Sequence, residues 1–313
     1  MQYDVSRIHA DHHFKINGVS YIGRPQSNTA MYIGKKIADQ LVKLESVEQC
    51  LVFAESGIEI SDWIRKNHAV ILVDNPQLAY ARLATELEWL QMQEDKKYKY
   101  LYMDGSCISE AAVIGSGAYI ESGCVIGHHV VIGKDAILLN GAVVKNAVIG
   151  DRFLANEYAV IGANSFTAAE DEKGNKIRIP SLGKVKIGND VEIGVHNNVS
   201  RGSVGDTILE DYVKLDALVH VGHDVHLKKN VEVTAGVIMA GYGIVGEKAF
   251  LGVNATLRNR IEIGDGALLG MGAVVTKTVE RDMIVAGNPA KVLRTVSGGV
   301  NSRNHIRLIR EAA

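Results

Sequence analysis

Three histidines stand three residues apart in the segment LVHVGHDVHL (218–227). They are His220, His223 and His226, and Asp224 directly follows the middle one. Imidazole is both the commonest metal ligand and a base that works near neutral pH. The segment therefore allows three interpretations: a metal site, a catalytic base with an orienting carboxylate, or surface histidines on a repetitive scaffold. Choosing among them requires the elements that position these side chains.

The segment belongs to a run that repeats every six residues. An aliphatic residue recurs at each sixth position from Leu209 to Val275, and Gly often follows it, as at Gly222. A six-residue period matches neither a helix nor a simple alternating strand, and it is typical of a β-solenoid built from hexapeptides. Three hexapeptides form the three flat sides of one coil, so eighteen residues return the chain to the same side.

The region before the repeats has a different pattern. Short apolar runs at 49–56 and 68–74 predict buried strands, and helical spacing appears at 34–44 and 59–67. Residues 75–98 carry a leucine and alanine stripe that predicts one long helix, with Pro76 at its start. We therefore predict an N-terminal α/β domain at 1–102, a β-helix domain at 103–294 and a tail with a short C-terminal helix at 295–313.

One insertion, residues 163–184, interrupts the repeats. It contains Gly174 and Pro180 and is polar, so we expect it to leave one face of the β-helix domain as a loop. Loops of this kind often contribute to the binding site of a solenoid.

Composition excludes several classes of protein. The net charge is −2, with 34 Lys+Arg against 36 Asp+Glu, which does not support nucleic-acid binding. Three cysteines without paired spacing argue against a disulfide scaffold and a zinc ribbon, and predict a cytoplasmic protein. We find no signal peptide and no run of eighteen apolar residues, so we expect no membrane span.

Five segments carry a resemblance to a known family. They are VDNPQLAYARL (73–83), NSFTAAEDEKGNKIRIPSLGKVKIGNDVEIG (164–194), SRGSVGDTILED (200–211), VGHDV (221–225) and AGVIMAG (235–241). These segments resemble the UDP-3-O-acylglucosamine N-acyltransferases of lipid A synthesis and related nucleotide-sugar N-acyltransferases. The resemblance implies a left-handed parallel β-helix after a small α/β domain, hence a mainly β fold.

The resemblance implies that His223 is the catalytic base and that the Gly241 N–H stabilises the oxyanion. The spacing supports this independently, because Gly241 follows His223 by eighteen residues and should stack on it, about 4.8 Å away. A base and an N–H donor in one column suit acyl transfer. A metal site is disfavoured, because three histidines at this spacing would not converge from one straight strand.

Other site residues are implied by the same resemblance. The family has an Asp where this chain has Ser200, and Asp224 resembles the His-Asp pair of the sister O-acyltransferases, so it is the candidate to orient His223. Asn28 and Tyr32 lie near the stretch that resembles the uracil-binding segment, where Lys35 and Ile37 depart from the family pattern. The resemblance also makes Phe166, Asn28 and Tyr32 expected substrate contacts. Asn197 and Arg201 are expected contacts because they lie about one coil before His223, and His220 is expected to contact the substrate or a subunit interface.

These observations predict an acyltransferase that moves an acyl group from acyl-CoA to the amine of a UDP- or dTDP-linked amino sugar, for surface polysaccharide synthesis. The ending IVAGNPAKVLR (284–294) resembles CoA-dependent sugar acetyltransferases. We expect a homotrimer, as in the family, with no permanently bound cofactor. Two alternatives stay open: the lipid A enzyme with a 3-hydroxyacyl carrier protein as donor, and a non-catalytic structural β-solenoid. The sugar, the amine position and the acyl length also stay open.

Overall fold

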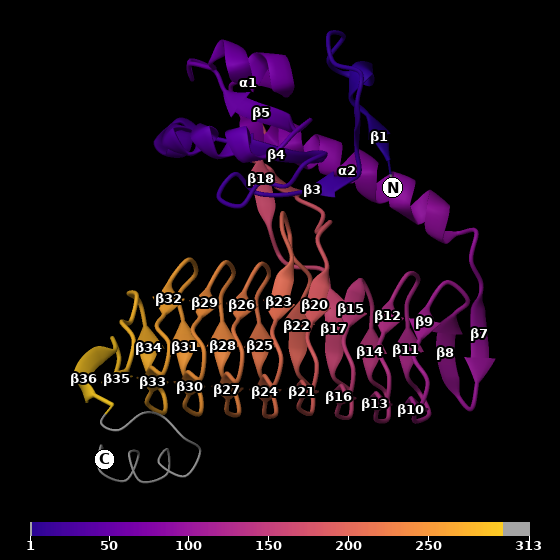
Figure 1. The fold of residues 1–313 in the computed structure, drawn as a ribbon, viewed down its shortest axis with the longest axis vertical. Coiled ribbons are helices and arrows are strands. Elements are labelled where there is room, and N and C mark those ends of the chain that lie inside the picture. Colours follow the sequence, from indigo (N-terminus) through magenta and orange to yellow (C-terminus); the bar gives the residue numbers. More distant parts are fainter. Residues whose placement is uncertain (1, 297–313) are drawn as a thin grey trace. The chain divides into compact units, whose positions relative to one another are not determined.

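The computed structural model describes residues 2–296, which divide into two units (Figure 1). The first unit runs to Lys97 and also takes in Asn164–Gly183 and Ser203–Gly205. The second unit comprises Tyr98–Ala163, Lys184–Gly202 and the chain from Asp206 onward. The insertion that we expected within the β-helix domain therefore packs with the N-terminal unit. No helix in this described part is both long enough and apolar enough to cross a membrane.

The second unit is the predicted left-handed parallel β-helix, and this fold class is confirmed. Each coil contributes one short strand to each of three parallel sheets, so that His220 pairs with Ile238, eighteen residues further on (Figure 1). The inward residue of each strand is aliphatic and buried, as Val221 and Leu227 are. Stacking of these side chains builds one continuous core along the unit.

The three faces of the β-helix are named here in the order in which the chain meets them. The first face contains β7 (Tyr100–Met103), β8 (Ser106–Ser109), β11 (Val125–Ile126), β14 (Val143–Val144), β17 (Val160–Ala163), β22 (Asn198–Ser200), β25 (His220–Val221), β28 (Ile238–Met239), β31 (Thr256–Leu257) and β34 (Val274–Val275). The second face contains β9 (Val113–Ile114), β12 (Val131–Ile132), β15 (Ala147–Ile149), β20 (Val185–Ile187), β23 (Thr207–Leu209), β26 (His226–Leu227), β29 (Ile244–Val245) and β32 (Glu262–Ile263). The third face contains β10 (Tyr119–Ile120), β13 (Ile137–Leu138), β16 (Leu154–Ala155), β21 (Glu192–Ile193), β24 (Lys214–Leu215), β27 (Glu232–Val233), β30 (Phe250–Leu251), β33 (Leu268–Leu269), β35 (Met283–Ala286) and β36 (Lys291–Thr295).

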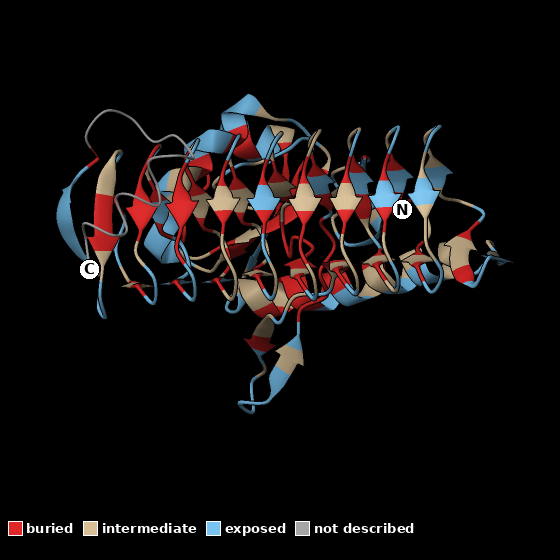
Figure 2. Ribbon diagram, turned by 90° about the horizontal axis from the view of Figure 1, so that it is seen from below, coloured by how far each residue is buried: buried red, intermediate tan, exposed pale blue. Residues whose placement is uncertain are grey.

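The outward side chains of the third face are more buried toward the C-terminal end of the β-helix (Figure 2). Tyr119 and Ile137 are exposed, whereas Phe250 and Leu268 are buried. The buried pair packs with Ile284 and Val296, which lie in and just after the antiparallel strands β35 and β36. This terminal hairpin was not predicted. The short helix that we predicted at 295–313 lies outside the described residues, apart from the end of β36 and Val296.

The first unit is an α/β domain, as predicted. Its parallel sheet has the order β3 (Gly18–Val19), β4 (Thr29–Ile33), β5 (Leu51–Glu55) and β6 (Ala69–Val73), beside the small antiparallel pair β1 (Tyr3–Asp4) and β2 (Lys15–Ile16). Its helical segments are η1 (Val5–Arg7), η2 (Lys35–Ser46), α1 (Asp62–Asn67) and α2 (Pro76–Asp95). The helical segment expected at 34–44 is present. It consists of 3₁₀ turns over residues 35–46, with a kink at Ile37, whose backbone is non-helical (φ −129°).

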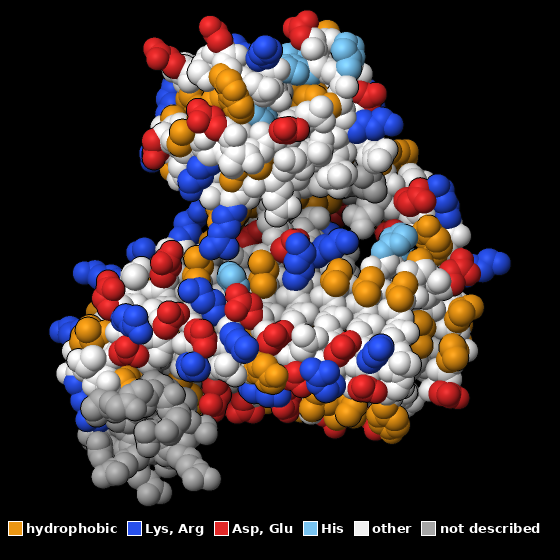
Figure 3. Space-filling model, in the orientation of Figure 1, with side chains coloured by type: hydrophobic (Ala, Val, Ile, Leu, Met, Phe, Trp, Pro, Cys, Tyr) orange, Lys and Arg blue, Asp and Glu red, His pale blue; other side chains and the backbone are white. Residues whose placement is uncertain are grey.

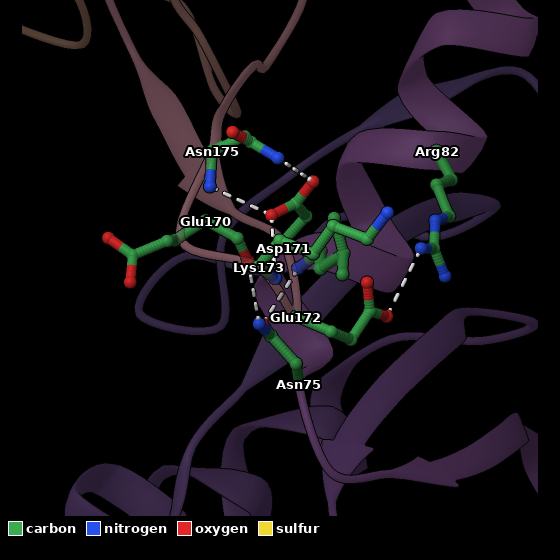
Figure 4. Close-up of polar contacts among 8 residues, drawn as sticks. Asn75, Arg82, Glu170, Asp171, Glu172, Lys173 and Asn175 are labelled. Atoms are coloured by element: carbon green, nitrogen blue, oxygen red, sulfur yellow. Dashed lines mark hydrogen bonds and ion pairs between the residues drawn. The ribbon is translucent and has the colours of Figure 1, made fainter.

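A hairpin from the insertion is tied to α2 within this unit (Figure 4). The hairpin consists of β18 (Ala168–Glu170) and β19 (Lys176–Arg178). Asn75 accepts from the Leu78 N–H at the start of α2 (3.0 Å) and donates through Nδ2 to the Glu170 carbonyl (3.0 Å). Further along α2, Arg82 pairs with Glu172 and Glu88 pairs with Arg178. These contacts explain why the insertion packs with the N-terminal unit.

Candidate active site

His223 and Asp224 form a hydrogen-bonded pair at a corner of the β-helix. They are the two turn residues between β25 on the first face and β26 on the second face. Asp224 has a left-handed backbone (φ 58°), which brings its carboxylate back to its neighbour, so that Oδ2 lies 2.7 Å from His223 Nδ1. A carboxylate only accepts, so Nδ1 carries the proton and Nε2 is left as the basic nitrogen.

The Asp224 carboxylate is held in place by its surroundings. Its side chain is 3% exposed and that of His223 is 16% exposed, so the carboxylate is shielded while the imidazole remains accessible. The Asp224 N–H donates to the Thr207 hydroxyl (2.9 Å), and Thr207 is fully buried. Ser200 is buried on β22, with its Oγ 3.5 Å from Asn198 Nδ2.

Gly241 lies directly against the imidazole, at the same turn position one coil later. A Cβ on Gly241 would meet His223 Cε1 and Nε2 at 2.6 Å, so only glycine allows the ring this approach. The next residue, Tyr242, donates its N–H to the His223 carbonyl (2.9 Å), which sets the two coils in register. The structure therefore brings together His223, Asp224 and Gly241, as the eighteen-residue spacing predicts for the first and third.

The N–H of Gly241 has no side-chain cap among the described residues. At some other turns of the β-helix a side-chain oxygen caps the first N–H: Asp211 caps Asn189 (2.7 Å), and Asp265 caps Glu247 (2.8 Å). Within residues 2–296, no acceptor bonds to the Gly241 N–H. An uncapped donor beside a basic nitrogen can bind the oxygen of a tetrahedral intermediate.

The three histidines of the opening segment have separate surroundings. His220 lies on the first face, where Asn198 Nδ2 donates to its Nδ1 (3.0 Å). His226 lies on the second face and donates through Nε2 to Glu210 (2.6 Å). Across the described residues, no group of three or more His, Cys, Asp or Glu side chains could hold a metal ion. Burial, with the nearby His223 as a second cause, lowers the pKa of His220 and favours its neutral form.

The other expected substrate contacts of the β-helix are buried. Asn197 is 1% exposed, and its Oδ1 accepts from the Val219 N–H (2.6 Å) at a different corner. Its Oδ1 therefore supports the coil, whereas its Nδ2 has no hydrogen-bond partner among the described residues. Arg201 is buried, and its N–H donates to the Ala163 carbonyl (2.9 Å), next to the two points where the chain leaves the β-helix unit.

The remaining expected contacts lie in the first unit. Phe166 is 97% exposed on the insertion, before β18. Asn28 donates through Nδ2 to Gln49 Oε1 (3.0 Å), and Tyr32 on β4 packs against Tyr80 of α2 (5.1 Å between ring centroids). Asn28 and Tyr32 thus have structural partners within their own unit, whereas the Phe166 side chain is exposed to solvent.

Sequence reasoning missed the partners of the His223 pair. Thr207 supports Asp224, and the Tyr242 ring lies 4.9 Å from the His223 ring in a perpendicular arrangement. Tyr242 follows Asp224 by eighteen residues, so the period that led to Gly241 could also have led to Tyr242. On the β-helix face shown in Figure 3, acidic and basic side chains are interspersed.

Known proteins share these repeats. A family model described as "Bacterial transferase hexapeptide (six repeats)" matches residues 111–146. A UDP-3-O-acylglucosamine N-acyltransferase of Janthinobacterium sp. (strain Marseille) is 37% identical over 131 residues, which cover 42% of this chain and 37% of that protein. One from Caulobacter sp. (strain K31) is 36% identical over 148 residues, covering 47% of this chain and 43% of that protein. The chain thus spans less than half the length of these curated relatives.

Solved structures share the fold at low sequence identity. The UDP-N-acetylglucosamine acyltransferase from Campylobacter jejuni has a TM-score of 0.57 at 19% identity, covering 66% of this chain and 81% of that chain. The Francisella novicida UDP-N-acetylglucosamine acyltransferase has a TM-score of 0.58 at 22% identity, covering 67% of this chain and 78% of that chain.

The repeats and the fold define a protein of the hexapeptide β-helix class, in which these relatives and neighbours are acyltransferases. Within that class, the predicted resemblance to the UDP-3-O-acylglucosamine N-acyltransferases is confirmed.

Proposed function

We propose that this chain is an N-acyltransferase that moves an acyl group from a thioester to the amine of a nucleotide-linked amino sugar. One observation carries the proposal: the His223 ring, held by a 2.7 Å contact between Nδ1 and Asp224, places its Nε2 against Gly241, whose N–H is uncapped in the described structure. A structural β-solenoid has no need of such a column, because its core and turns are complete without it.

The residues fit each step of the transfer. The sugar amine attacks the thioester carbonyl carbon, a C–N bond forms, and the carbonyl electrons move to oxygen, where the Gly241 N–H donates to the oxyanion. His223 Nε2 takes the proton that the attacking nitrogen loses, and Asp224 holds the resulting imidazolium. The oxyanion then collapses and the C–S bond breaks. His223 returns its proton to the departing sulfur, which leaves as a thiol.

For the acceptor, we propose a UDP-3-O-acylglucosamine, because the curated relatives carry that name over their matched segments. The matching donor is a 3-hydroxyacyl carrier protein. The earlier expectation of acyl-CoA and another UDP- or dTDP-linked amino sugar is the second candidate, which the segment at 284–294 favours. A homotrimer also remains a proposal, and light scattering on the purified chain would measure it.

The test is a transfer assay with the full chain. Each acceptor is combined with each donor, thiol release is followed by absorbance, and the product mass identifies acylation on nitrogen. We expect turnover with UDP-3-O-acylglucosamine and a 3-hydroxyacyl carrier protein. Turnover only with acyl-CoA and a different sugar would replace these substrates by the second candidate.

Two variants link the activity to the site. His223→Ala should lower kcat by about 100-fold or more, the usual contribution of a general base. The control is His196→Asn, at another corner, where the ring only stacks on Tyr158 (5.2 Å). If His223→Ala keeps wild-type kcat, or if the wild-type chain turns over no donor and acceptor pair, the acyltransferase proposal fails and the structural β-solenoid is favoured.

A further inference from the structure

A second column runs beside His223 and Gly241. It consists of the second turn residues of three successive coils: Asp224, Tyr242 and Arg260. The Tyr242 ring meets the His223 ring at 4.9 Å and 87° between planes. The Arg260 guanidinium lies 4.2 Å from the centroid of the same tyrosine ring. The tyrosine is therefore in contact with the imidazole and with a cation from the next coil.

The imidazole has a lateral contact in addition to its bond to Asp224. The bond to Asp224 is made by Nδ1, at one edge of the ring. Gly241 lies against Cε1 and Nε2 but has no side chain of its own. The half-buried ring of Tyr242 packs perpendicular to the imidazole, and a perpendicular aromatic contact at this distance is a favourable arrangement.

Arg260 in turn restricts Tyr242. The arginine is exposed, and in the described structure it forms no ion pair, so the tyrosine ring is the partner of its guanidinium. A cation above an aromatic face is attracted by the ring electrons. The Arg260 N–H also donates to the Gly241 carbonyl (3.1 Å), so the backbone that carries the cation is set in register with the site.

We propose that Tyr242, braced by Arg260, is a positioning residue that holds the His223 imidazole with Nε2 facing the reacting amine. The expected loss of kcat rests on the proposed function, whereas the expected effect on the position of the His223 ring does not. The contact to His223 that carries the proposal is made by the tyrosine ring, edge-on at 4.9 Å between ring centroids. Phe should therefore replace it, whereas Ala or Leu should not.

The kinetic test compares variants of the full chain. Tyr242→Ala and Tyr242→Leu should lower kcat by about 10- to 100-fold, as expected when a reacting group shifts by a fraction of an ångström to one ångström. KM for the sugar should stay near the wild-type value. Tyr242→Phe should keep most of the activity, and Arg260→Ala should give a smaller loss than Tyr242→Ala.

The chain contains a matched control. Tyr212 is also a second turn residue with a left-handed backbone (φ 63°, as for Tyr242), and the Lys229 ammonium lies 5.5 Å from its ring centroid. It lies at the corner between the second and third faces, after β23, away from the corner that holds His223. Tyr212→Ala should therefore leave kcat unchanged, while showing the cost in melting temperature of removing a tyrosine from such a turn.

A second readout does not depend on activity. Diethyl pyrocarbonate acylates an unprotonated imidazole nitrogen, and peptide mass spectrometry gives its rate at His223. We expect faster modification of His223 in Tyr242→Ala than in the wild type, with the wild-type rate in Tyr242→Phe and Tyr212→Ala. Wild-type modification and wild-type kcat in Tyr242→Ala would overturn the inference. A changed modification rate in a chain with no transferase activity would support the positioning role and refute the proposed function.

Discussion

Gly241→Ala is the sharpest test of the site geometry. Gly241 is not in the left-handed backbone region, so alanine causes no backbone strain there. The substitution also keeps the N–H that we assign to the oxyanion. Its only new group is a methyl, which would lie 2.6 Å from both Cε1 and Nε2 of His223. The perturbation is therefore directed at the imidazole alone.

The size of the effect follows from this distance. Non-bonded carbon contacts are comfortable from about 3.5 Å, so the ring must retreat by roughly 0.9 Å. A misplacement of about 1 Å in a reacting group costs roughly 100-fold in rate. That factor corresponds to about 2.7 kcal/mol of lost transition-state stabilisation. We therefore expect kcat to fall about 100-fold.

Gly243→Ala is the matched control for this experiment. A Cβ on Gly243 would meet only the Ile261 carbonyl oxygen at 3.7 Å and the Ala240 carbonyl oxygen at 3.8 Å, which are ordinary contacts. Both variants are assayed for transfer at saturating donor, and both are melted to check that they fold. A Gly241→Ala enzyme with kcat within two-fold of the Gly243→Ala enzyme would refute the reasoning, because the imidazole would then not lie where its position matters.

Two further predictions concern the first unit. Asn75→Ala should lower the free energy of unfolding by about 1 kcal/mol through loss of the cap on α2, whereas Asn75→Asp keeps that cap and loses only the bond to Glu170; equal melting temperatures for the two variants would contradict this division. Burial lowers the pKa of His68 below its ordinary value of about 6.5. As the pH drops below about 6.5, the unfolded chain therefore binds a proton at His68 more readily than the folded chain does, and the free energy of unfolding should fall. His68→Asn keeps an acceptor for the Cys50 N–H and should weaken this dependence in urea unfolding at pH 5 and pH 7.5; an unchanged dependence would count against His68 as its source.

The amino-acid sequence determines the β-helix and the main column of the site. The six-residue period places an aliphatic residue inward at every strand, and such a local pattern has one way to bury its apolar side chains. Three repeats make one coil, so the position of Gly241 against His223 follows from counting residues. The α/β character of the first unit follows in the same way, because its apolar runs and its helical stripe are local features.

Only the tertiary structure decides which side chains meet at a turn and between distant segments. Asp224 reaches His223 because of a left-handed turn (φ 58°), and strand alternation alone would have pointed the two apart. The insertion packs with the first unit through contacts such as Asn75 to Glu170, which join residues 95 positions apart. Periodicity sets the position of each backbone segment, but side-chain direction at corners and long-range pairing depend on neighbours that the local sequence does not specify.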